Sequence, residues 1–141
     1  MRILAVDPGE KRIGLALSDP TATIANPLTV LEFHSYDESA TRIVQLVSER
    51  GVEKIIVGQA LSPEGESTPS SRRARRLAGA IRARTSLPVE FWDETGSTQA
   101  ARASRLEMGV SRKKRRGHLD EIAATVILQA YLDHLRGDEF L

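Results

Sequence analysis

Acidic residues stand at three points of the sequence where a strand ends or a helix begins. Asp7 follows the apolar run of residues 3–6, Asp93 and Glu94 follow a short apolar segment, and Asp120 opens a long helical pattern. If the first and last strands lie parallel in one sheet, their carboxyl ends share an edge, where α/β sheets bind ligands. Three carboxylates that converge there would repel one another unless a divalent cation held them, and Mg²⁺ or Mn²⁺ prefers oxygen ligands. The acids therefore predict a metal site.

Each acid also has a purely structural explanation. Asp before Pro-Gly commonly opens a turn, and acids in a first helical turn complement the helix macrodipole. Their joint placement favours the metal site over three separate structural roles. The sequence leaves open which of Asp93 and Glu94 would be the ligand, because neighbouring residues of an extended strand point to opposite faces. We favour Glu94.

Basic residues gather in two blocks, although the net charge of +1 by itself predicts no partner. The first block is Arg72, Arg73, Arg75, Arg76, Arg82 and Arg84, and the second is Arg102, Arg105, Arg112, Lys113, Lys114, Arg115 and Arg116. One interpretation is two solvated helix faces and a flexible loop. Two such blocks in a nearly neutral chain favour a surface that binds a polyanion such as nucleic acid, with the run RKKRR as the stronger half.

The composition is that of a globular chain. At 141 residues, with 40% hydrophobic and 28% charged residues, we expect one domain that spans residues 1–141. The absence of Cys is compatible with a reducing cytoplasm. No run approaches the roughly 20 apolar residues of a membrane span, so we expect a cytoplasmic protein with no membrane partner.

Hydrophobic patterns predict an α/β fold built on a mixed five-stranded sheet with helices on both faces. The expected strands are residues 3–6, 12–17 and 25–33, which form an antiparallel meander, and then the parallel strands 54–57 and 88–92. The expected helices are one that begins near the possible cap Asp37 and stops at Gly51, one around residues 74–81, one at 97–108, and a long one that ends near Gly137. We expect LSPEGESTPSS to be an exposed loop, RKKRR to lie in another, and Trp92 and Tyr131 to be packing residues.

Four segments carry a resemblance to a known family. The strings VDPGEKRIGLALSD, IIVG with the polar loop after it, LPVEFWDE and HLDEIAATVILQAYLD resemble the YqgF family, which is described as a nuclease for the precursor of small-subunit ribosomal RNA and is related to Holliday-junction resolvases. The resemblance covers essentially the whole chain in the right order. It implies a ribonuclease-H-like fold.

The resemblance also implies residue roles. The catalytic acids of that fold carry over to Asp7, Glu94 and Asp120, which would bind Mg²⁺ or Mn²⁺ and hydrolyse phosphodiester bonds. Lys11, Arg12 and the basic run from Arg112 to Arg116 would grip the nucleic acid. The implied activity is processing of the 5′ end of pre-16S rRNA; the alternatives are a Holliday-junction resolvase of DNA recombination and repair, or a noncatalytic nucleic-acid-binding module.

The sequence departs from the family pattern in two places and leaves the oligomeric state open. Thr95 and Gly96 follow the Asp-Glu pair where the family usually has Arg and an apolar residue, and GQALSPEG is looser than the usual family loop. The turn at Asp7 also resembles the phosphate loop of actin-like and sugar-kinase ATPases, but those need a second lobe that 141 residues do not provide. Whether the protein is a monomer or a homodimer stays open, although cutting a junction would need two active sites.

Overall fold

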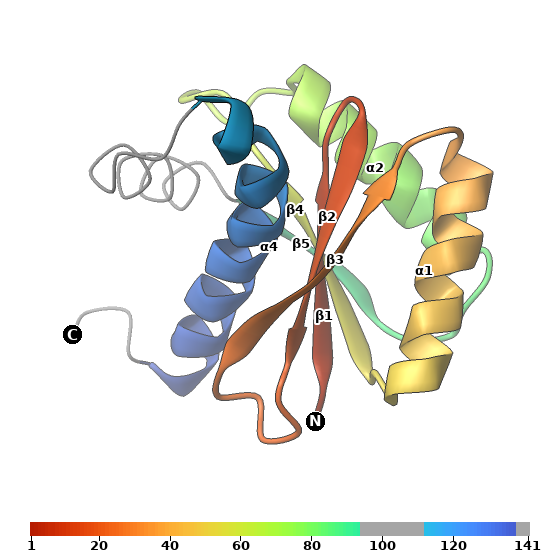
Figure 1. Cartoon of the computed structure of the whole chain (residues 1–141), viewed down its shortest axis with the longest axis vertical. Coiled ribbons are helices and arrows are strands. Elements are labelled where there is room, and N and C mark those ends of the chain that lie inside the picture. Colours follow the sequence, from red (N-terminus) through yellow and green to blue (C-terminus); the bar gives the residue numbers. More distant parts are fainter. Residues whose placement is uncertain (94–111, 138–141) are drawn as a thin grey trace.

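A twisted mixed sheet forms the centre of the computed structural model, which describes residues 1–93 and 112–137, with the backbone alone for 112–121 (Figure 1). Within these residues the sheet has five strands in the order β3-β2-β1-β4-β5. They are β1 (Ile3–Pro8), β2 (Arg12–Ser18), β3 (Ala25–Glu32), β4 (Lys54–Gln59) and β5 (Val89–Asp93). β1 pairs antiparallel with β2 and β2 with β3, whereas β1 with β4 and β4 with β5 are parallel. The predicted meander and parallel pair are confirmed.

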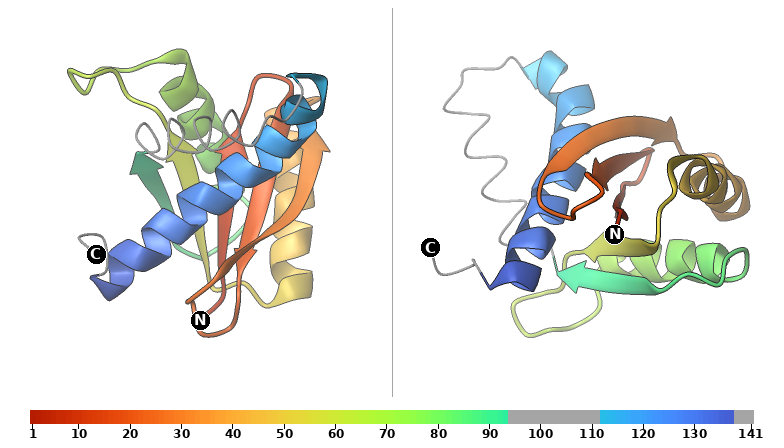
Figure 2. Two further views of the ribbon diagram at one scale, coloured as in Figure 1. Left: turned by 60° about the vertical axis from the view of Figure 1, so that its left-hand side comes forward. Right: turned by 90° about the horizontal axis from the view of Figure 1, so that it is seen from below.

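Helices cover both faces of the sheet, as the sequence predicts (Figures 1 and 2). α1 (Tyr36–Arg50) and α2 (Pro69–Arg82) lie on one face, and the long α4 (Arg112–Arg136) crosses the other. The helix predicted at 97–108 lies outside the described residues. Of the helices in the described part of the chain, none combines the length and the apolar character of a membrane span.

Alternation along β1 divides the apolar residues between two cores. Leu4 and Val6 pack with α1 and α2, and Ile3 and Ala5 pack with α4. All four side chains are fully buried. Because side chains alternate along a strand, the next odd residue, Asp7, belongs to the face that α4 covers.

The caps of α1 correct one prediction and confirm another. Ser35, not Asp37, is the N-cap: its backbone is extended, and its hydroxyl accepts a hydrogen bond from the Glu38 amide at 3.0 Å. Asp37 lies inside the first turn, where its charge complements the helix macrodipole. Gly51 ends the helix with a φ of 65°, in the left-handed region that glycine adopts readily.

The segment LSPEGESTPSS is exposed over most of its length, but its end is helical. Thr68 caps α2, its hydroxyl accepting from the Ser71 amide while the Ser71 hydroxyl accepts from the Thr68 amide. Pro69 is the first helical residue, where its missing N–H costs no hydrogen bond. The predicted loop is therefore three residues too long, because a reciprocal Thr-Ser cap and a leading Pro look like loop composition in the sequence.

The basic run RKKRR is helical, so its prediction as a loop was wrong. α4 begins at Arg112 and includes residues 112–116 in its first turns. No apolar periodicity marks these residues, yet Arg and Lys are good helix formers and continue the helix that follows. The predicted stop is confirmed, since Gly137 follows Arg136 with a φ of 76°.

Candidate active site

Asp7 is placed at the carboxyl end of the central strand β1. The four residues before it are fully buried, whereas Asp7 itself is half-buried. A tight turn follows, in which the Gly9 amide donates to the Arg12 carbonyl at 2.9 Å. A Cβ on Gly9 would clash with that carbonyl, so only glycine fits this turn. The turn fixes where β1 ends and thus where Asp7 lies.

Glycines flank Asp7 on both neighbouring strands. Gly14 of β2 is its direct cross-strand partner. On the other side Val6 pairs with Val57, so the next residue of β4, Gly58, lies beside Asp7. Strand alternation assigns both glycines to the α4 face, as it does Asp7. Interior strand glycines are typical of places where a ligand or another backbone approaches closely, and neither of these two buried glycines places a side chain of its own beside the carboxylate.

The other two predicted acids are described less fully. In β5, Phe91 packs toward the α1 and α2 core and Trp92 toward the α4 core, so alternation assigns Asp93 to the face opposite Asp7. Glu94 lies outside the described residues. Asp120 lies in α4, one turn before Ala124, which is buried against the sheet, but its side chain is not described. Among the described side chains, no three His, Asp or Glu residues form a group that could hold a metal ion.

Two of the predicted cations belong to the β1–β2 hairpin. Arg12 lies two residues before Gly14 on the same strand and therefore on the same α4 face. This makes Arg12 a diagonal cross-strand neighbour of Asp7, and the backbone positions of such neighbours are about 7–8 Å apart. Lys11 is exposed at the tip, and its carbonyl accepts from the Phe33 amide at 2.9 Å. Residues 112–116 begin α4 at this same end of the sheet (Figure 2), and only their backbone is described.

The first basic block divides into two groups. Arg82 donates to the Val89 carbonyl and stacks on Phe91, with 5.2 Å from guanidinium carbon to ring centroid. Arg84 pairs with Asp37 at 3.2 Å. These two arginines hold α2 to its neighbours.

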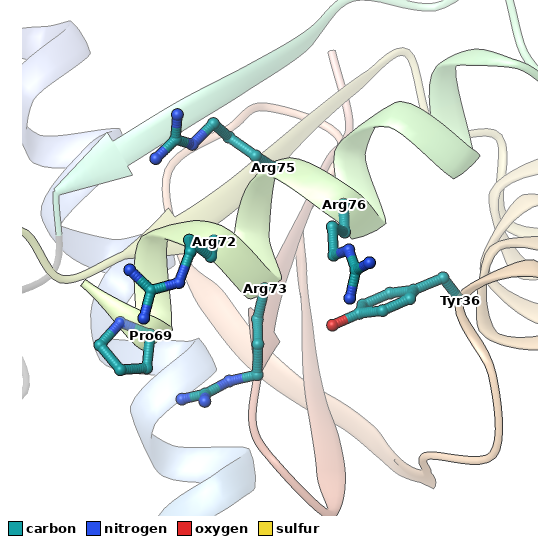
Figure 3. Close-up of a pocket in the computed structure, with 6 residues that line it drawn as sticks. All are labelled: Tyr36, Pro69, Arg72, Arg73, Arg75 and Arg76. Atoms are coloured by element: carbon teal, nitrogen blue, oxygen red, sulfur yellow. The ribbon is translucent and has the colours of Figure 1, made fainter. Parts of the chain in front are cut away.

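The other four arginines of that block line a pocket. Figure 3 shows this pocket, of about 580 Å³, and its lining residues are Tyr36, Pro69, Arg72, Arg73, Arg75 and Arg76. Sequence reasoning identified the arginines as a charged block but missed Tyr36, which comes from α1. Neither the block nor the helical pattern could reveal which residue of another helix faces it.

Aromatic residues near the site have packing roles, as predicted. Trp92 packs edge to face on Tyr131, with ring centroids 5.4 Å apart. The Tyr131 hydroxyl donates to Glu90 at 3.1 Å, and Lys54 pairs with the same carboxylate at 3.1 Å. Burial acts to lower the pKa of Lys54, but hydrogen bonds with Tyr131 and Glu90 outweigh it, so the pKa lies above its ordinary value. This network ties α4 to β4 and β5.

Comparison with known proteins gives close relatives over nearly the whole chain. A family model described as "RuvX: Holliday junction resolvase" matches residues 1–134. A protein of Chloroflexus aurantiacus is 40% identical over 136 residues, which cover 96% of this chain and 89% of that protein. One of Pelotomaculum thermopropionicum is 42% identical over 134 residues, covering 94% and 87%. Both carry the name "Putative pre-16S rRNA nuclease".

Solved structures share the fold at much lower identity. RuvC of T. thermophilus in complex with a Holliday junction substrate matches with a TM-score of 0.60 and 18% identity, over 98% of this chain and 97% of that one. The Holliday junction resolvase of fowlpox virus matches with a TM-score of 0.57 and 15% identity, over 95% and 99%. Both have a ribonuclease-H-like fold, so the predicted fold is confirmed.

Proposed function

The chain belongs to the RuvX family, the YqgF family that its motifs indicate, and from this premise we propose that it is a metal-dependent nuclease that hydrolyses phosphodiester bonds of structured nucleic acid. The observation that carries the proposal is the place of Asp7. It lies at the carboxyl end of the central strand, on the face that α4 covers, between two buried strand glycines of the kind found where a ligand or another backbone approaches closely. A carboxylate needed only to open a turn would not require glycine on both neighbouring strands.

The proposed metal ligands are Asp7, Glu94 and Asp120. Asp7 fits an oxygen-ligated cation because it is a half-buried carboxylate whose direct neighbours on both adjacent strands are glycines. Helical spacing supports Asp120, since residue 120 is four before Ala124, on the stripe of α4 that faces the sheet. Strand alternation supports Glu94 over Asp93. A bound Mg²⁺ or Mn²⁺ would orient an attacking water and stabilise the charge that develops on the phosphate and the leaving oxygen.

The residues around Asp7 would hold the substrate. Arg12 lies on the same face, within reach of a phosphate next to Asp7, and Lys11 extends the positive charge to the hairpin tip. Gly14 and Gly58 would let the phosphate backbone approach the sheet closely. The basic start of α4, from Arg112 to Arg116, would add phosphate contacts at the same end.

The proposed substrate is the 5′ end of pre-16S rRNA, processed in the cytoplasm during ribosome biogenesis. The names of relatives at about 40% identity support it, because they match this chain over nearly its full length. The second candidate is a Holliday junction, supported by the description of the family model. Resolving a junction needs two cuts and therefore a homodimer, whereas trimming an RNA end is possible for a monomer.

The decisive experiment compares cleavage of two substrates by the purified protein. A structured RNA with a 5′ extension and a four-way DNA junction are each incubated with Mg²⁺, with Mn²⁺ or with EDTA, and the mass of the protein in solution is measured. We expect cleavage only with a divalent cation, and none by Asp7→Asn, which should still bind nucleic acid. Cleavage by pure Asp7→Asn at the wild-type rate would contradict the mechanism. The preferred substrate and the mass decide between the two candidates.

A further inference from the structure

We propose that the arginine pocket, formed by Arg72, Arg73, Arg75 and Arg76 of α2 with Tyr36 and Pro69, is a second phosphate-binding site that holds the nucleic-acid strand away from the bond that is cut. The inference rests on the proposed function, since it assumes a nucleic-acid substrate. It adds a contact surface on the opposite side of the sheet from α4. The proposed ligand is the phosphate groups of one strand.

The charge of the pocket is not neutralised by the fold. Within the described part of the chain, none of its four guanidinium groups forms an ion pair with a carboxylate, whereas Arg84 just beyond the same helix does. Like charges three or four residues apart on a helix lie side by side and repel one another. Pairs of that spacing occur among these four arginines. A bound polyanion would turn this repulsion into attraction.

Two of the four guanidinium groups, those of Arg75 and Arg76, are held by contacts within the chain before any ligand arrives. Arg76 stacks over the Tyr36 ring, with 5.5 Å from guanidinium carbon to ring centroid. Arg75 donates to the Ser67 hydroxyl at 2.7 Å. The Arg73 Nε is buried and has no hydrogen-bond partner among the described residues. A guanidinium group can donate to two phosphate oxygens at once. Arginines that form no ion pair within the chain therefore suit a phosphate group.

Figure 3 shows from which side of α2 the arginine side chains extend. Arg73 and Arg76 extend from the side of α2 that faces Tyr36, and Arg75 extends from the opposite side. Pro69 and the Tyr36 ring are the apolar groups of the lining. The four arginines give the lining a positive charge, which favours a chain of phosphates as the ligand.

The position of the pocket links it to Asp7. α2 begins at the carboxyl end of β4, the end of the sheet where Asp7 lies, but α2 packs on the opposite face (Figure 1). The β1–β2 hairpin, with Lys11 at its exposed tip, marks the same end. A strand held at both places would cross this end of the sheet, with cations along its path. The pocket would thus fix the direction of the strand relative to the cut.

The test measures binding without cleavage. Arg73→Gln/Arg76→Gln is compared with Arg42→Gln/Arg50→Gln, which removes the same charge from exposed positions of α1 outside the pocket. Anisotropy of labelled structured RNA and of a four-way junction is recorded in EDTA over a range of salt concentrations. We expect the pocket variant to bind about tenfold or more weakly, and its slope of log affinity against log salt to be shallower by roughly 0.7–0.9 for each phosphate that the variant no longer neutralises. The control should keep the wild-type slope.

Two further arms make the outcome decisive. If thermal melting shows that Arg73→Gln/Arg76→Gln does not fold, Arg72→Gln/Arg76→Gln replaces it and leaves Arg73, whose Nε is buried, intact. Strands with a 5′-phosphate and strands with a 5′-hydroxyl are compared. An equal loss of affinity for both means that the pocket binds internal phosphates, whereas a loss confined to the 5′-phosphate strand means that it binds a terminal phosphate. Either result supports the site.

A pocket variant that binds with the affinity and slope of the control overturns the inference. That result leaves the nuclease proposal intact, because cleavage by the wild type is measured separately. Conversely, a wild type that binds but never cleaves contradicts the nuclease proposal and leaves the result for the pocket standing.

Discussion

Asp7 and Asp19 are carboxylates at opposite ends of the same sheet, and their surroundings differ. Asp19 follows β2 and accepts hydrogen bonds from the amides of Ile24 at 2.9 Å, Thr23 at 2.7 Å and Thr21 at 3.2 Å. The Ile24 amide, the Thr21 hydroxyl and the other two amides hold the pKa of Asp19 far below its ordinary range. Asp7 lies at the carboxyl end of β1, between the buried strand glycines Gly14 and Gly58.

The polar groups around the two ends of the sheet also differ. Near Asp19, Gln129 of α4 accepts from the Ala25 amide at 3.0 Å and donates to the Thr23 carbonyl at 3.1 Å, and Arg136 pairs with Asp133 at 2.8 Å. At the Asp7 end, the four arginines of the arginine pocket form no ion pair with a described carboxylate. The fold therefore uses the charge at one end for its own stability and leaves charge available for a ligand at the other.

The largest expected effect is that of Asp7→Asn on the cleavage rate, with little effect on the free energy of unfolding. Asp7→Asn should reduce cleavage by roughly a hundredfold to a thousandfold, because losing a ligand carboxylate removes several kcal/mol of charge stabilisation. Its free energy of unfolding should stay within about 0.5 kcal/mol of the wild type or rise, as for many functional-site residues. Single-turnover cleavage and urea unfolding check this. A variant that keeps its rate but unfolds more easily would make Asp7 structural, like Asp19.

The second effect tests the strand glycines beside Asp7. Gly58→Ala adds one methyl group on the α4 face, and we expect cleavage to fall by about tenfold to a hundredfold, since small displacements of a bound phosphate are costly. Gly79→Ala in α2 is the matched control: no atom lies within 4 Å of its added Cβ. That control should keep its rate and gain about 0.5–1 kcal/mol of stability. Equal rates for both variants would show that the glycine beside Asp7 does not matter for cleavage.

Much of this contrast could be predicted from the sequence. The apolar run that ends at Asp7, the Pro-Gly turn and the short strand repeats are local signals, because period-two alternation and turn chemistry depend on neighbouring residues. They predicted the sheet and the end at which Asp7 lies. Alternation also raised the choice between Asp93 and Glu94, and the faces of β5 now assign Asp93 to the side away from Asp7.

The missing parts depend on residues distant in the sequence. Gly14 and Gly58 flank Asp7 only because of the strand register, which no local pattern reveals. Tyr36 reaches the arginine pocket because α1 and α2 pack side by side on one face. The helical state of RKKRR was missed because intrinsic propensity, not apolar spacing, governs those residues.

The third effect belongs to the Asp19 end. Asp19→Asn should lower the stability at pH 7 and leave the single-turnover rate unchanged. Because the pKa of Asp19 is depressed in the folded state, its contribution is present above the ordinary carboxyl pKa and is lost as the pH falls toward the folded-state value. Urea unfolding at pH 7, 4 and 3 should therefore show a gap between wild type and variant that narrows below about pH 4. A gap independent of pH would mean that geometry, not charge, makes the loop stable.

The smallest effect tests whether the attachment of α4 serves stability alone. Tyr131→Phe removes a hydroxyl that donates to Glu90 and helps to raise the pKa of Lys54. We expect a loss of about 0.5–1 kcal/mol in unfolding free energy, at the lower part of the usual range because Glu90 is half exposed and water can replace the bond.

The sign of the pH dependence is opposite to that of Asp19. A raised lysine pKa contributes stability below about pH 10 and loses it as the pH rises through the folded-state value, so the gap between wild type and Tyr131→Phe should narrow above about pH 10. Tyr36→Phe, whose hydroxyl has no hydrogen-bond partner in the described part of the chain, is the control for removing a hydroxyl. If Tyr131→Phe slowed cleavage as much as Gly58→Ala does, the two ends of the sheet would be coupled through α4, and the division between a stabilising end and a binding end would fail.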